Sequence, residues 1–231
     1  MRQKPNSNDT PTPLVVLSSG GKDSLYMIER LRRDPSWRIE SLLTTMETPA
    51  RRVAMHGTSA SLLEAQADAL GLDLVCVELP ESCGNDEYQR LLGSALARFS
   101  GHGVATVACG DLFLNDIRTW RERSFETLGW RPVFPIWHAS TPALAQRLFE
   151  PPWEIIVTGV DTAVLDEQFL GRPYDAAWVD ALPDTVDPCG ENGEFHTFVC
   201  NGPGFERRLA VTEGRRFLAH DRFLTLELDL A

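Results

Sequence analysis

The chain has 231 residues, of which 43% are hydrophobic and 24% are charged, and its 33 acidic and 22 basic side chains give a net charge of −11. This composition excludes an intrinsically disordered chain, and the length allows one large domain or two modest ones. Because proteins that wrap a nucleic-acid backbone need a basic surface, the acidic balance argues against broad nucleic-acid binding.

The cysteine content and the N-terminal segment indicate the compartment. Five cysteines occur without a C-x-x-C pair, which argues against a disulfide framework and against a zinc site. Residues 1–13 lack the apolar core of a signal peptide, and no apolar run approaches the roughly 20 residues that span a bilayer. We therefore expect a cytoplasmic protein with no membrane partner.

Strand-like and helix-like segments alternate from residue 13 onward. Short apolar runs predict buried strands, whereas apolar residues spaced three or four positions apart predict helices. The expected strands are 14–18, 39–45, 72–79 and 104–109, and the expected helices are 24–33, 59–70, 86–99 and 117–128. This order predicts an α/β fold with a parallel sheet and helices on both of its faces.

The pattern changes near residue 130, where two prolines interrupt the segment 131–137. A helix is expected at 142–149 and a strand at 153–160, and shorter alternating strands are expected at 195–200, 208–213 and 223–230. We therefore predict a flexible tail at 1–12, a ligand-binding domain at 13–129, and a smaller C-terminal α/β substrate domain at 130–231.

A glycine-rich segment lies between the first expected strand and the first expected helix. This glycine loop consists of Ser19, Gly20, Gly21, Lys22, Asp23 and Ser24. Glycines allow the backbone N–H groups to approach a ligand, and a helix N-terminus attracts anions. The loop is therefore a candidate phosphate site, in which Lys22 supplies a charge and Asp23 holds Mg²⁺. The alternative is a plain turn that caps the helix; neither a Walker loop nor a Rossmann fingerprint is present.

The loop and several later segments resemble known families. SGGKDS after a first strand resembles the PP-loop of the N-type ATP pyrophosphatases. Together with this loop, the later segments resemble the diphthine–ammonia ligase family and its bacterial relatives over residues 14–199. These segments are RVAMHG at 52–57, EAQA at 64–67, GD at 110–111, RER at 121–123, PIW at 135–137 and CGENGEFHT at 189–197. Asn192, Phe195 and His196 depart from the usual family pattern.

The resemblance implies both a fold and a reaction. The implied fold is Rossmann-like, of the adenine nucleotide α-hydrolase type, with residues 13–129 as a PP-loop ATP-binding domain. The implied activity is that of an amide ligase, which uses ATP and Mg²⁺ to adenylate a carboxylate and couples it to ammonia, with release of AMP and pyrophosphate. The carboxylate is either borne by a protein or a small molecule such as a corrinoid precursor, and a homodimer is left open.

Two other functions remain as alternatives. One keeps the adenylation step but uses sulfur as the nucleophile, as in RNA-thiolating relatives; the acidic charge and the missing C-x-x-C pair weigh against it. The other is a non-catalytic ATP-binding module. Release of AMP and pyrophosphate would separate this module from both ligases.

Further candidate residues follow the expected strands, where ligands bind in parallel sheets. Gly110 and Asp111 follow the fourth strand, and we expect Asp111 to orient the nucleotide or the substrate. His56 follows the second strand and either contacts ATP or substrate or is a loop histidine without a task. Arg118 and Arg121 would steady a phosphate or a carboxylate, or would be solvated. Trp137 is expected to pack between the domains.

Two glutamates flank a predicted turn near the C-terminus. Asn192 and Gly193 favour a two-residue hairpin turn, which would make Glu191 and Glu194 direct neighbours. Because facing carboxylates repel each other, such a pair would share a proton or a cation, for which ammonium is suitable. Both glutamates are therefore candidate catalytic residues; the alternative is an exposed acidic turn.

Overall fold

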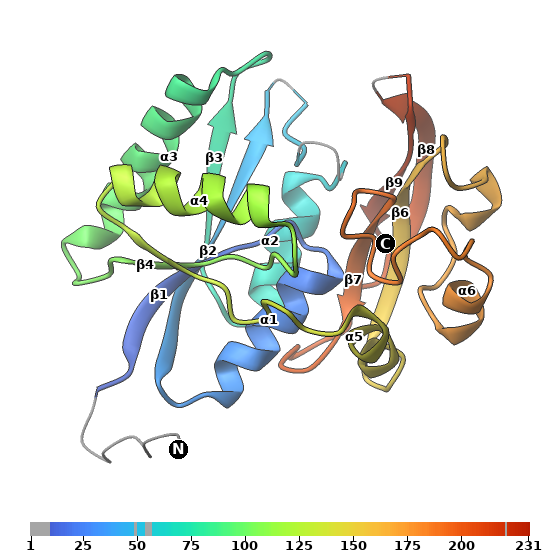
Figure 1. The fold of residues 1–231 in the computed structure, drawn as a ribbon, viewed down its shortest axis with the longest axis horizontal. Helices are drawn as coiled ribbons and strands as arrows, with labels where there is room; N and C mark the ends of the chain where they lie inside the picture. The colour runs from blue at the N-terminus through green and yellow to red at the C-terminus, as the bar shows by residue number, and fades with distance from the viewer. Residues whose placement is uncertain (1–9, 49, 54–56, 220) are drawn as a thin grey trace.

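The structure is a computed structural model that describes residues 10–48, 50–53, 57–219 and 221–231. Two sheets stand next to each other in the molecule (Figure 1). The first is formed by β1 (Thr12–Leu17), β2 (Trp37–Glu47), β3 (Leu74–Leu79), β4 (Thr106–Ala108) and β5 (Arg131–Val133), with helices α1 (Lys22–Arg33), α2 (Ala60–Ala69), α3 (Asn85–Ser100) and α4 (Asn115–Thr127). The second is formed by β6 (Glu154–Asp161), β7 (Phe195–Asn201), β8 (Val211–Ala219) and β9 (Phe223–Leu230), with helices α5 (Thr141–Leu148) and α6 (Ala176–Asp180) and a 3₁₀ helix (Glu167–Phe169).

The first sheet has the strand order β3-β2-β1-β4-β5, and every neighbouring pair is parallel. Successive side chains of a strand point to opposite faces, so a strand that is apolar throughout can be buried on both. On one face, Leu14 of β1 belongs to a buried cluster with Leu25 of α1. On the other face, Val15 belongs to a cluster with Leu92 of α3 and Phe125 of α4. The predicted α/β fold, a parallel sheet with helices on both faces, is confirmed.

Strand β5 lies in the segment that the sequence pattern leaves unassigned. Among the described residues it pairs only with β4, and it forms an edge of the first sheet, beyond residue 129, the expected end of the first domain. A proline cannot donate a hydrogen bond to a neighbouring strand, but an edge strand needs donors on one side only. Pro132 is therefore tolerated in β5. The predicted tail at 1–12 lies mostly outside the described residues, and Thr12 already belongs to β1.

The second sheet has the order β7-β6-β9-β8, and all of its pairs are antiparallel. It stands on the side of the first sheet that carries α1 and α2 (Figure 1). One buried cluster runs from Leu14 in the first sheet to Leu228 in the second, so the two sheets share a core. No helix among the described residues is long and apolar enough to cross a membrane.

The glycine loop connects the two sheets directly. It follows β1, and its Gly20 carbonyl accepts a hydrogen bond of 3.1 Å from the backbone N–H of Val199 in β7. The backbone N–H of Lys22 donates to Thr197 Oγ1 of the same strand at 3.1 Å. The carboxyl end of β1 therefore faces β7, and residues from both sheets can line a site there.

Candidate functional site

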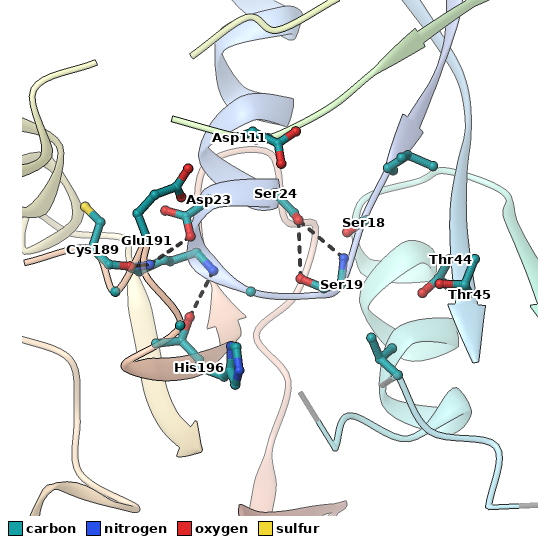
Figure 2. Close-up of a pocket in the computed structure, with 18 of the residues that line it drawn as sticks. Ser18, Ser19, Asp23, Ser24, Thr44, Thr45, Asp111, Cys189, Glu191 and His196 are labelled. Carbon is teal, nitrogen blue, oxygen red and sulfur yellow. Dashed lines mark hydrogen bonds and ion pairs between the residues drawn. The ribbon is translucent and has the colours of Figure 1, made fainter. Parts of the chain in front are cut away.

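A cavity of about 370 Å³ opens where the parallel strands end. Residues of the glycine loop and residues of the second sheet line this cavity together, and Figure 2 shows them in close-up. Asp23 and Glu191 lie together on one side of the loop, whereas Thr44 and Thr45 of β2 lie on the other. A cleft of this size at the carboxyl ends of parallel strands is the usual place for a small ligand in such folds.

The glycine loop exposes the N-terminus of α1 to the cavity. Gly20 has φ +81°, in the left-handed region that glycine adopts without strain. Gly21 is the N-cap residue of α1 and has no side chain to cap the helix; in the first turn, the N–H of Lys22 donates to Thr197 Oγ1. The first turn of a helix has N–H groups without helical acceptors and carries a partial positive charge. The loop therefore has the features of an anion site.

Lys22 is buried at the base of the loop, with 2% exposure. Its Nζ donates to Asp23 Oδ2 at 2.8 Å and to the backbone carbonyl of Cys189, and it lies 5.1 Å from the centre of the Phe195 ring. Burial opposes the charged form, but the charge of Asp23, the hydrogen bond to it and the nearby Cys189 and Glu191 together outweigh this effect and raise the pKa of Lys22. Lys22 thus remains an ammonium ion and also ties the loop to the segment that precedes β7.

Asp23 is suited to hold a cation together with a phosphate. Its Oδ1 atom is buried and has no hydrogen-bond partner among the described residues, so one carboxyl oxygen is left without a partner; burial raises the pKa of this group, and the charge of Lys22 opposes the increase. The described part of the chain contains no group of three or more His, Cys, Asp or Glu residues that could hold a metal. Mg²⁺ commonly binds through one or two carboxylates together with substrate phosphates and water. The donor set therefore fits Mg²⁺ only in company with a phosphate ligand.

Gly110 and Asp111 line the cavity beyond the end of β4. Asp111 forms an ion pair with Arg121, whose Nε lies 2.8 Å from Oδ2, and Arg121 also lines the cavity. Arg118 lies elsewhere: its guanidinium group is 4.8 Å from the ring centres of both Phe134 and Trp137. The structure therefore places Arg121, but not Arg118, in the cavity wall.

The hairpin predicted at Asn192 and Gly193 is wrong. Residues 188–194 form consecutive turns, in which Gly190 and Gly193 have φ +67° and +85°, and β7 pairs with β6 instead of with a strand just before the turn. The left-handed backbone conformation of these two glycines makes the segment a series of turns, so it does not form two antiparallel strands. Glu191 and Glu194 consequently do not face each other across a hairpin.

The two glutamates have separate hydrogen-bond donors. Glu191 lines the cavity, and its Oε1 accepts from the backbone N–H groups of Leu112 at 2.7 Å and Phe113 at 3.2 Å. Glu194 is 6% exposed, and its carboxylate accepts from the N–H of Asp187 and from both the N–H and the side-chain amide of Asn192. Glu194 thus stabilises the turn, whereas Glu191 can act in the cavity.

The pKa of Glu191 reflects its place in the wall. Burial raises this pKa, and the two backbone N–H donors partly offset the increase. The negative charges of Asp23 and Asp111 raise it further. A carboxyl group whose pKa is raised towards neutrality is suited to accept and release a proton.

Tyr88, Thr44, Thr45 and His196 are among the side chains of the wall that sequence reasoning missed. The two threonines lie near the end of a predicted strand, where ligands bind, so their position was a usable signal. His196 stands out in the sequence only as a departure from the family pattern. His56, a candidate ATP contact, lies outside the described residues.

The pKa of His196 predicts how stability depends on pH. Burial, together with the charge of Lys22, lowers this pKa from 6.5 to about 4. Because the unfolded chain binds a proton on His196 between these values and the folded chain does not, the free energy of unfolding should decrease as the pH falls from 6.5 to 4. The loss attributable to His196 is at most about 3 kcal/mol.

Denaturant titrations at about pH 7.5 and about pH 4.5 test this expectation. His196→Gln should lose less stability between the two conditions than the wild-type protein. An equal loss in both proteins would contradict the prediction.

Comparisons with known proteins agree with these features. Residues 13–132 match the diphthamide synthase N-terminal domain, and residues 140–227 match the diphthamide synthase C-terminal domain. A relative from Bos taurus named diphthine–ammonia ligase is 23% identical over an alignment 249 residues long, which spans 94% of this chain and 92% of the relative. Since the N-terminal match alone spans more than half of the 231 residues, the chain belongs to the diphthamide synthase family, as its motifs predicted.

Proposed function

We propose that the protein is an ATP-dependent ligase that converts a carboxylate to an amide with ammonia and releases AMP and pyrophosphate. The observation that carries this proposal is the N-terminus of α1, which begins at a glycine N-cap and which the glycine loop exposes to a cavity walled by both sheets. Backbone N–H groups at such a helix end favour phosphate. The ligase name of the Bos taurus relative supports the reaction class.

The residues that line the cavity would have different roles in the reaction. The glycine loop would hold the phosphates, with the ammonium group of Lys22 close behind them and Asp23 holding Mg²⁺ against them. Bound ATP would supply the activation, because a carboxylate and ammonia do not condense unaided in water. Glu191 would take up the proton that the nitrogen loses as the amide forms, and Asp111 would orient the nucleotide or the substrate.

The name of the relative pairs diphthine with ammonia, and we propose diphthine, or a carboxylate that resembles it, as the acceptor. The alternative acceptor is a small carboxylate such as a corrinoid precursor. Both would use the same cavity and the same ATP chemistry, so a comparison of substrates separates them.

Product analysis tests the reaction class. Incubation with labelled ATP, ammonium and each candidate carboxylate is expected to yield AMP, pyrophosphate and amide in equal amounts, and omission of ammonium should abolish the amide. Steady formation of ADP without AMP would contradict the proposal. If ATP binds but no AMP is released in the presence of any candidate carboxylate, the result would instead indicate a non-catalytic ATP-binding module.

A further inference from the structure

Helix α2 carries a buried glutamine that the proposed reaction does not use. Gln66 is 1% exposed and lies behind the glycine loop, outside the cavity lining. Its Nε2 donates to the backbone carbonyl of Gly20 at 3.1 Å and to that of Val199 at 2.8 Å. One side-chain amide therefore joins the glycine loop to β7, the two walls between which the cavity lies.

The hydrogen bonds of Gln66 add to a direct hydrogen bond between the glycine loop and β7. The Gly20 carbonyl also accepts from the N–H of Val199, so the same two residues are joined twice. Both groups that face Nε2 are acceptors, so the side chain must supply two hydrogens from one atom. Neither a carboxylate nor an apolar side chain can do so.

Helix α2 also packs closely against the loop. A Cβ atom built on Gly20 would lie 2.6 Å from Leu63 Cδ2 and 3.3 Å from Gln66 Oε1, so the loop backbone touches the helix. Gln66 Oε1 is buried and has no hydrogen-bond partner among the described residues. Burying an amide is costly unless its hydrogen bonds form, so filling space is better served by an apolar side chain. The contribution of Gln66 therefore lies in its two donated bonds.

We propose that Gln66 is a positioning residue that holds the glycine loop at a fixed distance from β7. The inference rests on the proposed ATP-dependent function, because it concerns the N–H groups that would receive the phosphates. A displacement of about 1 Å in such a site can cost about a hundredfold in activity. Loss of Gln66 should consequently affect ATP binding even though its side chain does not line the cavity.

Gln66→Met tests the proposal, because it removes both donors and keeps a flexible side chain of similar length. We expect ATP to bind about tenfold more weakly, with KM for ATP raised more than kcat is lowered. Without ATP, hydrogen exchange should be faster in peptides covering 19–24 and 195–201. The matched control is Gln89→Met, which removes a 3.1 Å bond from Gln89 Nε2 to Ser124 Oγ between α3 and α4. Gln89→Met should change neither the affinity for ATP nor the hydrogen exchange of the two peptides.

Several outcomes would overturn the inference. If wild type binds ATP and Gln66→Met binds it equally well, Gln66 does not position the loop, whether or not exchange is faster. Unchanged exchange in both peptides would have the same meaning. If Gln66→Met does not fold, Gln66→Asn, which keeps the amide but is one methylene too short, is measured in its place. Wild-type protein that does not bind ATP would overturn the proposed function itself, and the inference with it.

Discussion

Replacing Lys22 by alanine is expected to weaken ATP binding by about ten- to a hundredfold. The ammonium group bonds to Asp23 and to the Cys189 carbonyl, so the variant loses a positive charge behind the phosphates and the tie that holds the loop. Hydrogen bonds to charged groups contribute about 1.5–3 kcal/mol, and about 1.4 kcal/mol corresponds to a tenfold change in affinity. Titration calorimetry with ATP measures the change.

Two further variants make the result specific. Arg30→Ala removes the same charge from the exposed face of α1 and should leave ATP affinity unchanged. Gly21→Val should weaken binding as Lys22→Ala does, because even the first added carbon would lie 3.1 Å from the Thr197 carbonyl oxygen. Wild-type affinity in both Lys22→Ala and Gly21→Val would remove the glycine loop from the ATP site.

Replacing Glu191 by glutamine is expected to lower kcat by about 10²- to 10⁴-fold, the usual contribution of a general base, with ATP affinity nearly intact. The amide oxygen of glutamine can still accept from the N–H groups of Leu112 and Phe113, so the wall should keep its shape. Because burial raises the pKa of Glu191, the acidic limb of the wild-type kcat profile should lie above the ordinary carboxyl range. Steady-state kinetics with saturating ATP measures both effects.

Glu194→Gln provides the matched comparison, since it makes the same chemical change three residues away. Glu194 accepts hydrogen bonds from Asp187 and Asn192 and does not line the cavity, so this variant should lower the melting temperature more than kcat. Excess ammonium should partly rescue Glu191→Gln if the variant fails to capture ammonium, but not if it fails to remove the proton. Wild-type turnover in Glu191→Gln would indicate that the nitrogen site lies near Asp111 and not at Glu191.

The first sheet could be predicted because its signals are local. In the sequence, each buried parallel strand is a short apolar run, and each helix between the strands has apolar residues three or four positions apart. The expected strand at 39–45 corresponds to β2 (Trp37–Glu47), and the expected helix at 86–99 corresponds to α3 (Asn85–Ser100). The position of the glycine loop between a strand and a helix also follows from neighbouring residues alone. Strand β5 escaped prediction because only its place at the sheet edge makes Pro132 acceptable.

The partners of the site residues could not be predicted, since they come from distant parts of the chain. Lys22 bonds to Cys189 across 167 positions, and Glu191 accepts from Leu112 across 79. The Asn-Gly pair is a local hairpin signal, but left-handed glycines at 190 and 193 and the pairing of β7 with β6 override it. Local sequence therefore determines which residues form the candidate phosphate site, because a turn and a helix end are built from neighbours. The docking of β7 against the glycine loop decides which carboxylate reaches the cavity, because packing between distant segments sets that geometry.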